Sequence, residues 1–219
     1  MSGSTITGVS TMAKPIGYTI HLLRVGETAW DADSRIIGLT DLPMTQAGSN
    51  AVADAIRSFE PDHPISHILT SNEESAQWSA NLMITSPDIK LKSIDNLANV
   101  GMGLWEGELE SILEERCPSA YNQWKENPAR ITPPEGESFY DAQDRLASSI
   151  IKAISKVKGT HPSLAIMLRP WAWAIVRCWL NEQKMCDIWS QLDEPMQVET
   201  FELMKSQIDS YQSRAKASA

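Results

Sequence analysis

The chain has few cysteines, few basic residues and no long apolar run. Its three cysteines, Cys117, Cys178 and Cys186, are odd in number and show no metal-ligand spacing. This pattern argues against a disulfide framework and favours a reducing, cytoplasmic compartment. No stretch of about 18 apolar residues occurs, so we expect no membrane span. Lys and Arg number 19 against 28 Asp and Glu, a formal net charge of -9, so we expect neither nucleic acid nor an anionic membrane as a partner.

The composition is ordinary for one globular domain, with 42% hydrophobic and 21% charged residues in a chain of 219. Residues 1–16 lack the apolar segment of a signal peptide and are expected to form a flexible tail. Residues 212–219 are polar and are expected to be frayed. The segment 17–211 contains no repeat, linker or low-complexity block, and we interpret it as a single domain.

Short apolar runs alternate with stretches of helical periodicity, which favours an α/β layered domain. Residues 86–107 and 127–138 have no clear period and are expected to be irregular. The sequence predicts strands at 18–24, 67–70 and 163–168, extended pieces near 187–192 and 197–203, and helices at 45–59, 75–84, 111–125 (broken at Pro118), 139–157 and 170–180.

Five motifs carry a resemblance to a known family. Leu23–Asp31 reads Leu-Arg-Val-Gly-Glu-Thr-Ala-Trp-Asp and resembles the signature Leu/Val-Arg-His-Gly-Glu-Thr-x-x-Asn of the histidine phosphatase superfamily. Gly38–Gly48 resembles that family's next block, Gly-x-Thr-Asp-x-Pro-Leu-Thr-x-x-Gly. Three further landmarks match phosphoglycerate-mutase-like members, in the same order as in the family: Leu104–Gly107, Trp124–Pro128 and Pro134–Ser138.

The resemblance spans about residues 18 to 180 and implies a fold and a place for the site. The implied fold is the phosphoglycerate-mutase-like three-layer α/β/α sandwich around a six-stranded mixed sheet. The implied site lies at the carboxyl ends of the strands, where open α/β sheets bind their ligands.

The catalytic residues that the resemblance implies are absent from this chain. The family's phosphoryl-carrying histidine corresponds to Val25, which has no lone pair to attack phosphorus. A second family histidine, which helps hold the phosphoryl group, corresponds to Arg169. The general-acid position aligns with Asn99, and a carboxamide cannot donate and accept protons in turn. The sequence therefore predicts no catalytic residue at these positions.

The phosphate-binding residues of the family are also largely replaced. The family's phosphate-clamping arginine corresponds to Ser75, and the asparagine of the signature corresponds to Asp31, whose charge repels phosphate. Arg24 alone is retained from that set. Pro170 removes a backbone N–H at the start of a predicted helix, and Trp171 places an indole where the family has glycine. These changes predict a smaller and more apolar pocket, although Trp171 is equally well explained as a core residue.

The four histidines of the chain do not replace the missing ones. His21 lies four residues before Val25, about 13 Å back along an extended strand. His67 and His161 lie near the starts of strands, at the wrong end, and His63 lies in a proline-bounded loop. We interpret all four as surface or core residues without a catalytic role.

The resulting hypothesis is a catalytically inactive phosphoglycerate mutase/phosphatase-like protein, a pseudoenzyme that binds a small anion or a protein partner. The ligand-binding candidates are Arg24, Asp31, Ser75, Arg169 and Trp171. Arg24 and Arg169 suit a carboxylate or phosphate, unless Asp31 pairs with one of them and closes the site. Two alternatives stay open: an active phosphatase or phosphomutase with a non-histidine mechanism, and a structural subunit such as a homodimer. We expect no cofactor and no metal, because Asp31 is the only clear carboxylate at the pocket.

Overall fold

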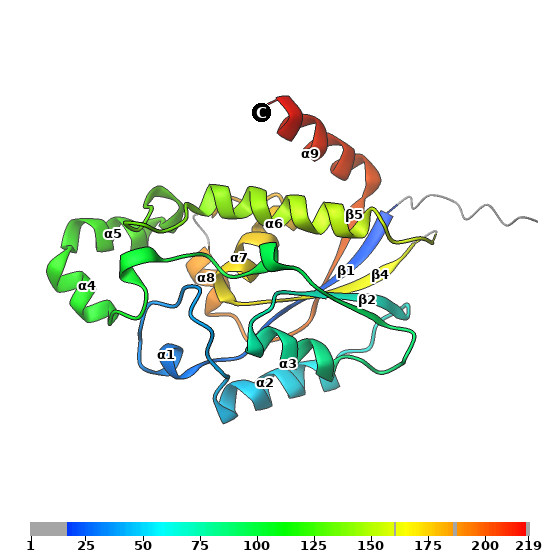
Figure 1. Cartoon of the computed structure of the whole chain (residues 1–219), viewed down its shortest axis with the longest axis horizontal. Coiled ribbons are helices and arrows are strands. Elements are labelled where there is room, and N and C mark those ends of the chain that lie inside the picture. Colours follow the sequence, from blue (N-terminus) through cyan, green and yellow to red (C-terminus); the bar gives the residue numbers. More distant parts are fainter. Residues whose placement is uncertain (1–16, 160, 186–187, 218–219) are drawn as a thin grey trace, which may run out of the picture.

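The computed structural model describes residues 17–159, 161–185 and 188–217. The tail expected at residues 1–16 lies outside the described residues. A sheet of five strands runs through the domain, in the order β3-β2-β4-β1-β5 (Figure 1). The first four strands of this order are parallel, and β5 pairs antiparallel to β1. The strands are β1 (Gly17–Arg24), β2 (Ile65–Thr70), β3 (Lys90–Ser93), β4 (Ser163–Leu168) and β5 (Glu199–Met204).

The expected mixed sheet is confirmed, but the expectation of six strands is corrected to five within the described residues. The segment near 187–192, expected to be extended, contains the helix α8 (Ile188–Leu192), in which Ile188 and Leu192 share one helical face. Strand β3 lies inside a segment expected to be irregular. It is a short edge strand whose Lys90 and Lys92 are exposed, a composition that gives little hydrophobic signal and blocks pairing with other chains.

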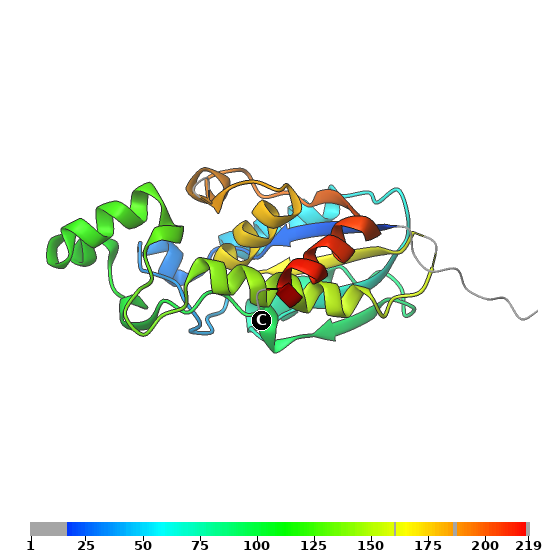
Figure 2. The same cartoon turned by 90° about the horizontal axis from the view of Figure 1, so that it is seen from above.

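Helices cover both faces of the sheet (Figures 1 and 2). Helices α2 (Gln46–Arg57) and α3 (Glu74–Leu82) lie on one face, and α6 (Phe139–Ile154) and α7 (Pro170–Leu180) lie on the other. Beyond the carboxyl ends of the strands lie the short α1 (Ala29–Ala32), α4 (Glu110–Arg116) and α5 (Pro118–Glu126). Helix α9 (Lys205–Ala217) continues past residue 211, where we expected the folded domain to end and the chain to fray.

Successive side chains of β1 point to opposite faces of the sheet and so contribute to two hydrophobic cores. Ile20 and Leu22 belong to the larger core with α6 and α7, whereas Leu23 belongs to the smaller core with α2 and α3. Helix α6 begins where the Ser138 side chain accepts a hydrogen bond from the Asp141 N–H. The register pairs Arg24 with Leu168, so β1 and β4 end at the same level and present residues 25 and 169 side by side.

His21 is a buried residue of β1 with both ring nitrogens bonded. Its Nδ1 lies 3.0 Å from the Thr200 hydroxyl, its Nε2 lies 2.9 Å from the Ser163 hydroxyl, and its ring packs edge-on against Phe59. Burial lowers the pKa of His21, and the charges of Glu202 and Asp62 oppose this shift. The side chain therefore belongs to the core and lies on β1 well before the carboxyl end.

The lowered pKa of His21 predicts how the free energy of unfolding depends on pH. Because the folded state holds a neutral imidazole, the unfolded chain binds more protons below about pH 6.5, and stability falls as the pH drops from there toward the folded-state pKa. Urea unfolding between pH 5 and 8 should show this loss. In the variant His21→Gln the decline below pH 6.5 should be shallower. An equal or steeper decline in the variant would contradict the assignment.

Candidate active site

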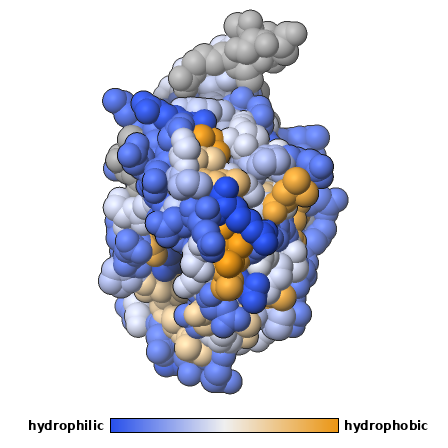
Figure 3. Space-filling model, turned by 90° about the vertical axis from the view of Figure 1, so that its left-hand side faces the viewer, coloured by the Kyte–Doolittle hydropathy of each residue, from blue (hydrophilic) through white to orange (hydrophobic). Residues whose placement is uncertain are grey.

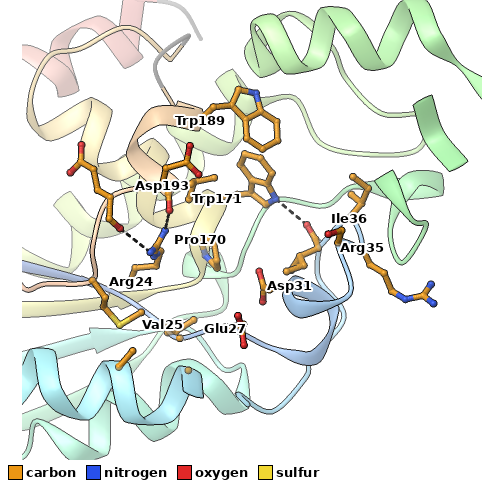
Figure 4. A pocket seen from close by; sticks show the side chains of 18 of the residues that line it. Arg24, Val25, Glu27, Asp31, Arg35, Ile36, Pro170, Trp171, Trp189 and Asp193 are labelled. Carbon is orange, nitrogen blue, oxygen red and sulfur yellow. Dashed lines mark hydrogen bonds between the residues drawn. The ribbon is translucent and has the colours of Figure 1, made fainter. Parts of the chain in front are cut away.

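A cleft of about 710 Å³ opens at the carboxyl ends of β1 and β4, where the family's site was expected (Figure 4). Its floor is formed by the turn that follows β1, and its walls by α1, α2, the start of α7 and the segment after α8. Figure 3 shows this end of the molecule, where hydrophobic residues form several separate patches within a mostly hydrophilic surface. The lining includes four of the residues discussed above together with two that the sequence did not single out: Arg24, Val25, Asp31, Trp171, Trp189 and Asp193.

Arg24 reaches the cleft but its guanidinium is already bonded. Nη1 donates to the Leu192 carbonyl and Nη2 donates to the Glu194 carbonyl at 3.3 Å. The group also lies 5.4 Å from the centre of the Trp173 ring. Burial lowers the pKa of Arg24, and the carboxylates of Asp31, Asp193, Glu194 and Glu199 counteract it. Arg24 therefore fixes the segment after α8 against β1, and nearby acids surround its charge.

Val25 and Asp31 lie at the floor and side of the cleft. Val25 is 2% exposed, and its backbone N–H donates to the Leu168 carbonyl at 2.9 Å, which extends the β1–β4 pairing by one residue. Asp31 accepts hydrogen bonds through one oxygen, Oδ2, from the Thr28 N–H at 2.7 Å and the Thr28 hydroxyl at 2.8 Å. Asp31 therefore caps the start of α1 through Thr28. Among the described residues it forms no ion pair with Arg24 or Arg169.

Arg169 and Ser75 do not line the cleft. Arg169 is 1% exposed, and its Nη1 donates to the Thr40 carbonyl at 2.8 Å, while Nε and Nη2 have no partner among the described residues. The Ser75 side chain is equally buried, and its hydroxyl also has no partner there. Arg169 and Ser75, expected to bind a ligand, are therefore both buried beneath the surface. The side chain of Arg169 points toward the loop at Thr40 and away from the cleft.

Asn99, at the position aligned with the family's general acid, is fully buried and forms hydrogen bonds to several separate segments. Its Oδ1 accepts from the Ala172 N–H at 3.1 Å, and its Nδ2 donates to the Gly38 carbonyl at 3.1 Å. Its backbone N–H donates to Glu73 at 3.0 Å. Helix α7 has no side-chain cap of its own, so Asn99 satisfies one of its free N–H groups from a distant loop. This carboxamide has a structural role.

Trp171 forms one wall of the cleft and is part of an aromatic cluster. Its Nε1 donates to the Ile37 carbonyl at 3.1 Å. Its ring centre lies 5.0 Å from that of Trp189, 5.8 Å from Trp124 and 5.4 Å from Phe139. The indole of Trp171 therefore belongs to a core aromatic cluster and also lines the cleft. Trp173 is buried beneath it, whereas Trp78 is exposed on α3.

Helix α8 and the residues just after it supply site residues that the sequence did not reveal. Trp189 of α8, and Asp193 and Glu194 after it, line the cleft. Glu194 is held by Arg177, whose Nη2 lies 2.8 Å from Oε2. Periodicity predicted an extended piece here, so the only available signal was the acidic pair that follows Leu192.

The part of the chain that the structure describes holds neither a metal-binding cluster nor a membrane-spanning helix. In that part of the chain, no group of three or more His, Cys, Asp or Glu side chains has an arrangement that could hold a metal ion. Equally, none of the helices described is long and apolar enough to cross a membrane.

A parallel sheet with an antiparallel edge strand, covered by helices and carrying a cleft at the carboxyl ends of β1 and β4, defines an open-sheet α/β protein. The sequence model of the histidine phosphatase superfamily (branch 1) matches residues 20–204. The chain therefore belongs to the histidine phosphatase superfamily.

Individual proteins agree with this assignment. A probable phosphoglycerate mutase, GpmB, of Yersinia enterocolitica is 29% identical over 153 residues, which cover 66% of this chain and 67% of that protein. The solved structure of Bacillus stearothermophilus YhfR matches with a TM-score of 0.70 and 22% identity, over 79% of this chain and 84% of that one. A mycobacterial glucosyl-3-phosphoglycerate phosphatase in complex with VO3 matches with a TM-score of 0.66 and 19% identity, over 78% and 85%. At these identities the two structures show the fold alone.

The structural role of Asn99 predicts a large loss of stability on truncation. Asn99→Ala leaves the buried Ala172 N–H and Gly38 carbonyl without partners, so we expect the free energy of unfolding to fall by about 2–4 kcal/mol. Urea unfolding measures this change. The matched control is Asn122→Ala, an exposed position on α5 that should change stability by less than about 0.5 kcal/mol. Similar losses in both variants would contradict the role of Asn99.

Proposed function

We propose that this protein is a non-catalytic member of the histidine phosphatase superfamily that acts by binding. The observation that supports this most is at the ends of β1 and β4. Position 25, aligned with the phosphoryl-carrying histidine, holds a valine in the floor of the cleft, and position 169, aligned with the second histidine, holds a buried arginine. Neither side chain can attack phosphorus, because valine has no lone pair and guanidinium stays protonated.

The remaining catalytic positions support the same proposal. Both ends of the Asn99 carboxamide are hydrogen-bonded, to Ala172 and to Gly38, so the group is unavailable as an acid. Asn99 also lies outside the cleft lining. Ser75 is buried and cannot clamp a phosphate in the cleft. Replacement of four positions with groups that now serve packing or hydrogen bonding favours a pseudoenzyme over a displaced mechanism.

Of the two classes of ligand expected, the site favours a protein partner over a small anion. Arg169 is sealed from solvent, and Arg24 donates to two backbone carbonyls, with Asp31 and Asp193 near its charge. An anion entering the cleft would meet these carboxylates before it met an unoccupied guanidinium donor.

The alternative of an active enzyme needs Asp31 or a water molecule as the nucleophile. One oxygen of this carboxylate is bonded twice by Thr28, which holds it in the start of α1. The alternative of an assembly subunit needs a large exposed apolar face. The exposed large hydrophobic residues of the described chain lie on five separate segments: Leu39, Trp78 with Leu82 on α3, Leu104, Tyr140 and Met204. Neither alternative accounts for the cleft as well as binding does.

A sensitive phosphatase assay tests the absence of catalysis. Hydrolysis of p-nitrophenyl phosphate at high protein concentration, from pH 5 to 8 and with or without magnesium, should match buffer and a heat-denatured sample. The reason is the lack of a nucleophile in the cleft floor. Turnover that co-purifies with the protein and is lost in Asp31→Asn or Arg24→Met would contradict the proposal and assign the reaction to those residues.

A thermal-shift experiment separates the two classes of ligand. Inorganic phosphate at about 100 times its dissociation constant would add roughly 2.7 kcal/mol of stability. For a chain of this length that corresponds to roughly 5–11 °C in the melting temperature. With potassium phosphate at 10 mM, against potassium chloride at the same ionic strength, we expect no shift above 1 °C, because the arginines at the site are already bonded. A shift of several degrees that is lost in Arg24→Met would favour the small anion.

A further inference from the structure

The charged residues of the cleft have an excess of negative charge. The lining contains two arginines and five carboxylates: Arg24, Arg35, Glu27, Asp31, Glu110, Asp193 and Glu194. Both arginines donate to backbone carbonyls, Arg24 to Leu192 and Glu194, and Arg35 to Gly107 at 2.8 Å. A cleft in a family that handles phosphate esters has thus become one that attracts positive charge.

Three of the five carboxylates have no ion-pair partner. Glu110 pairs with Lys125 at 3.1 Å, and Glu194 pairs with Arg177. Glu27, Asp31 and Asp193 form no ion pair with any described residue; the side chain of Asp193 is exposed and forms no hydrogen bond there either, while Oδ1 of Asp31 stays unbonded beside Thr28. In Figure 4 these three carboxylates stand around the same opening as Trp171 and Trp189.

The chain itself shows that this rim can hold an ammonium group. The Lys125 Nζ lies 4.1 Å from the centre of the Trp189 ring and 3.1 Å from Glu110. Aromatic faces attract cations through their quadrupole, and an adjacent carboxylate adds to that attraction. Trp171 lines the same cleft with Asp31 and Asp193, and among the described residues no lysine or arginine lies over its ring, so this part of the cleft combines an aromatic side chain with carboxylates.

A second hollow continues the cleft along α2. It has a volume of about 480 Å³ and shares Ala51 and Met196 with the cleft. Small side chains of α2 line both hollows from Ala47 to Ser58, a rise of roughly 16 Å, which is the length of about five extended residues. The opposite wall is the segment 196–198, and the lining of this second hollow holds no basic residue and one acid, Asp54, which pairs with Arg57 at 2.7 Å.

We infer that the cleft and its continuation along α2 bind an extended segment of a partner protein, with a lysine or arginine side chain of that segment entering between Trp171, Trp189 and the carboxylates of Asp31 and Asp193. This inference rests on the proposed function and names the chemistry of its partner. The excess of carboxylates in the cleft lining favours a partner with a basic side chain, because opposite charges attract. The continuation along α2 selects a segment of chain rather than a free amine, because an amine would fill the cleft alone.

A peptide library tests the inference with the full chain. The labelled protein is panned against bead-bound random octapeptides, and the composition of the bound peptides is compared with the input. We expect Lys or Arg to be enriched by roughly threefold or more at one position and Asp and Glu to be depleted throughout. Enrichment of acidic residues, or no enrichment of any residue, overturns the inference.

Solution binding of the enriched peptide then assigns the side chains. Replacing its basic residue by norleucine removes the charge and keeps an apolar stem, and the dissociation constant is followed by calorimetry and tryptophan fluorescence. Asp193→Asn should weaken the basic peptide roughly twofold to fivefold and leave the norleucine peptide unchanged. The matched control, Asp88→Asn, removes an exposed carboxylate from the loop before β3 and should affect neither peptide. Equal effects of the two variants overturn the assignment to the cleft.

The remaining outcomes are also distinguishable. n-Butylammonium chloride should bind at least about 100-fold more weakly than the enriched peptide, since it lacks contacts along α2. Equal affinity overturns the protein segment in favour of a small amine. Failure of the peptide to bind leaves the phosphatase assay unaffected, whereas turnover of p-nitrophenyl phosphate overturns the proposed function whether or not peptides bind.

Discussion

The carboxamide of Asn99 joins the parts of the molecule that surround the site. It bonds the start of α7 through Ala172 and the signature loop through Gly38, while its backbone bonds Glu73 at the start of α3. Helix α7 needs this partner because Pro170 has no N–H and Arg169 supplies no side-chain cap. The start of α7 in turn places Trp171 in the cleft wall. Asn99 therefore links the start of α7, the loop at Gly38 and the start of α3.

The charge of the cleft lining depends on the directions in which two arginine side chains point. Arg169 is buried toward Thr40, and Arg24 is bonded to the segment after α8, which brings Asp193 and Glu194 over β1. The cleft keeps the place that the fold gives it but has an acidic and aromatic lining. The fold therefore carries no information about the charge of the ligand, which depends on these side-chain directions.

Much of the fold was predictable from local patterns, and much of the site was not. The strands at β1 and β4 and the helix from Pro170 to Leu180 were found because they are apolar, periodic and bounded by clear signals. Strand β3 was missed because an exposed edge strand needs few hydrophobic residues, and α8 because five residues give too short a period. The family motifs located Arg24, Val25 and Asp31 in the cleft. They could not show that Arg169 and Ser75 are sealed, since a motif fixes a backbone position and leaves the side-chain direction to packing.

The bonds of Asn99 also limit how this chain could change over evolutionary time. A carboxylate at position 99, the first step toward a catalytic acid, would place a charged oxygen against the Gly38 carbonyl in a fully buried space. A histidine at position 169 would leave the Thr40 carbonyl without its present donor. Either substitution alone would lower the free energy of unfolding without supplying a complete set of catalytic groups. The hydrogen bonds that Asn99 and Arg169 make therefore tie the present side chains at these two positions to the stability of the fold.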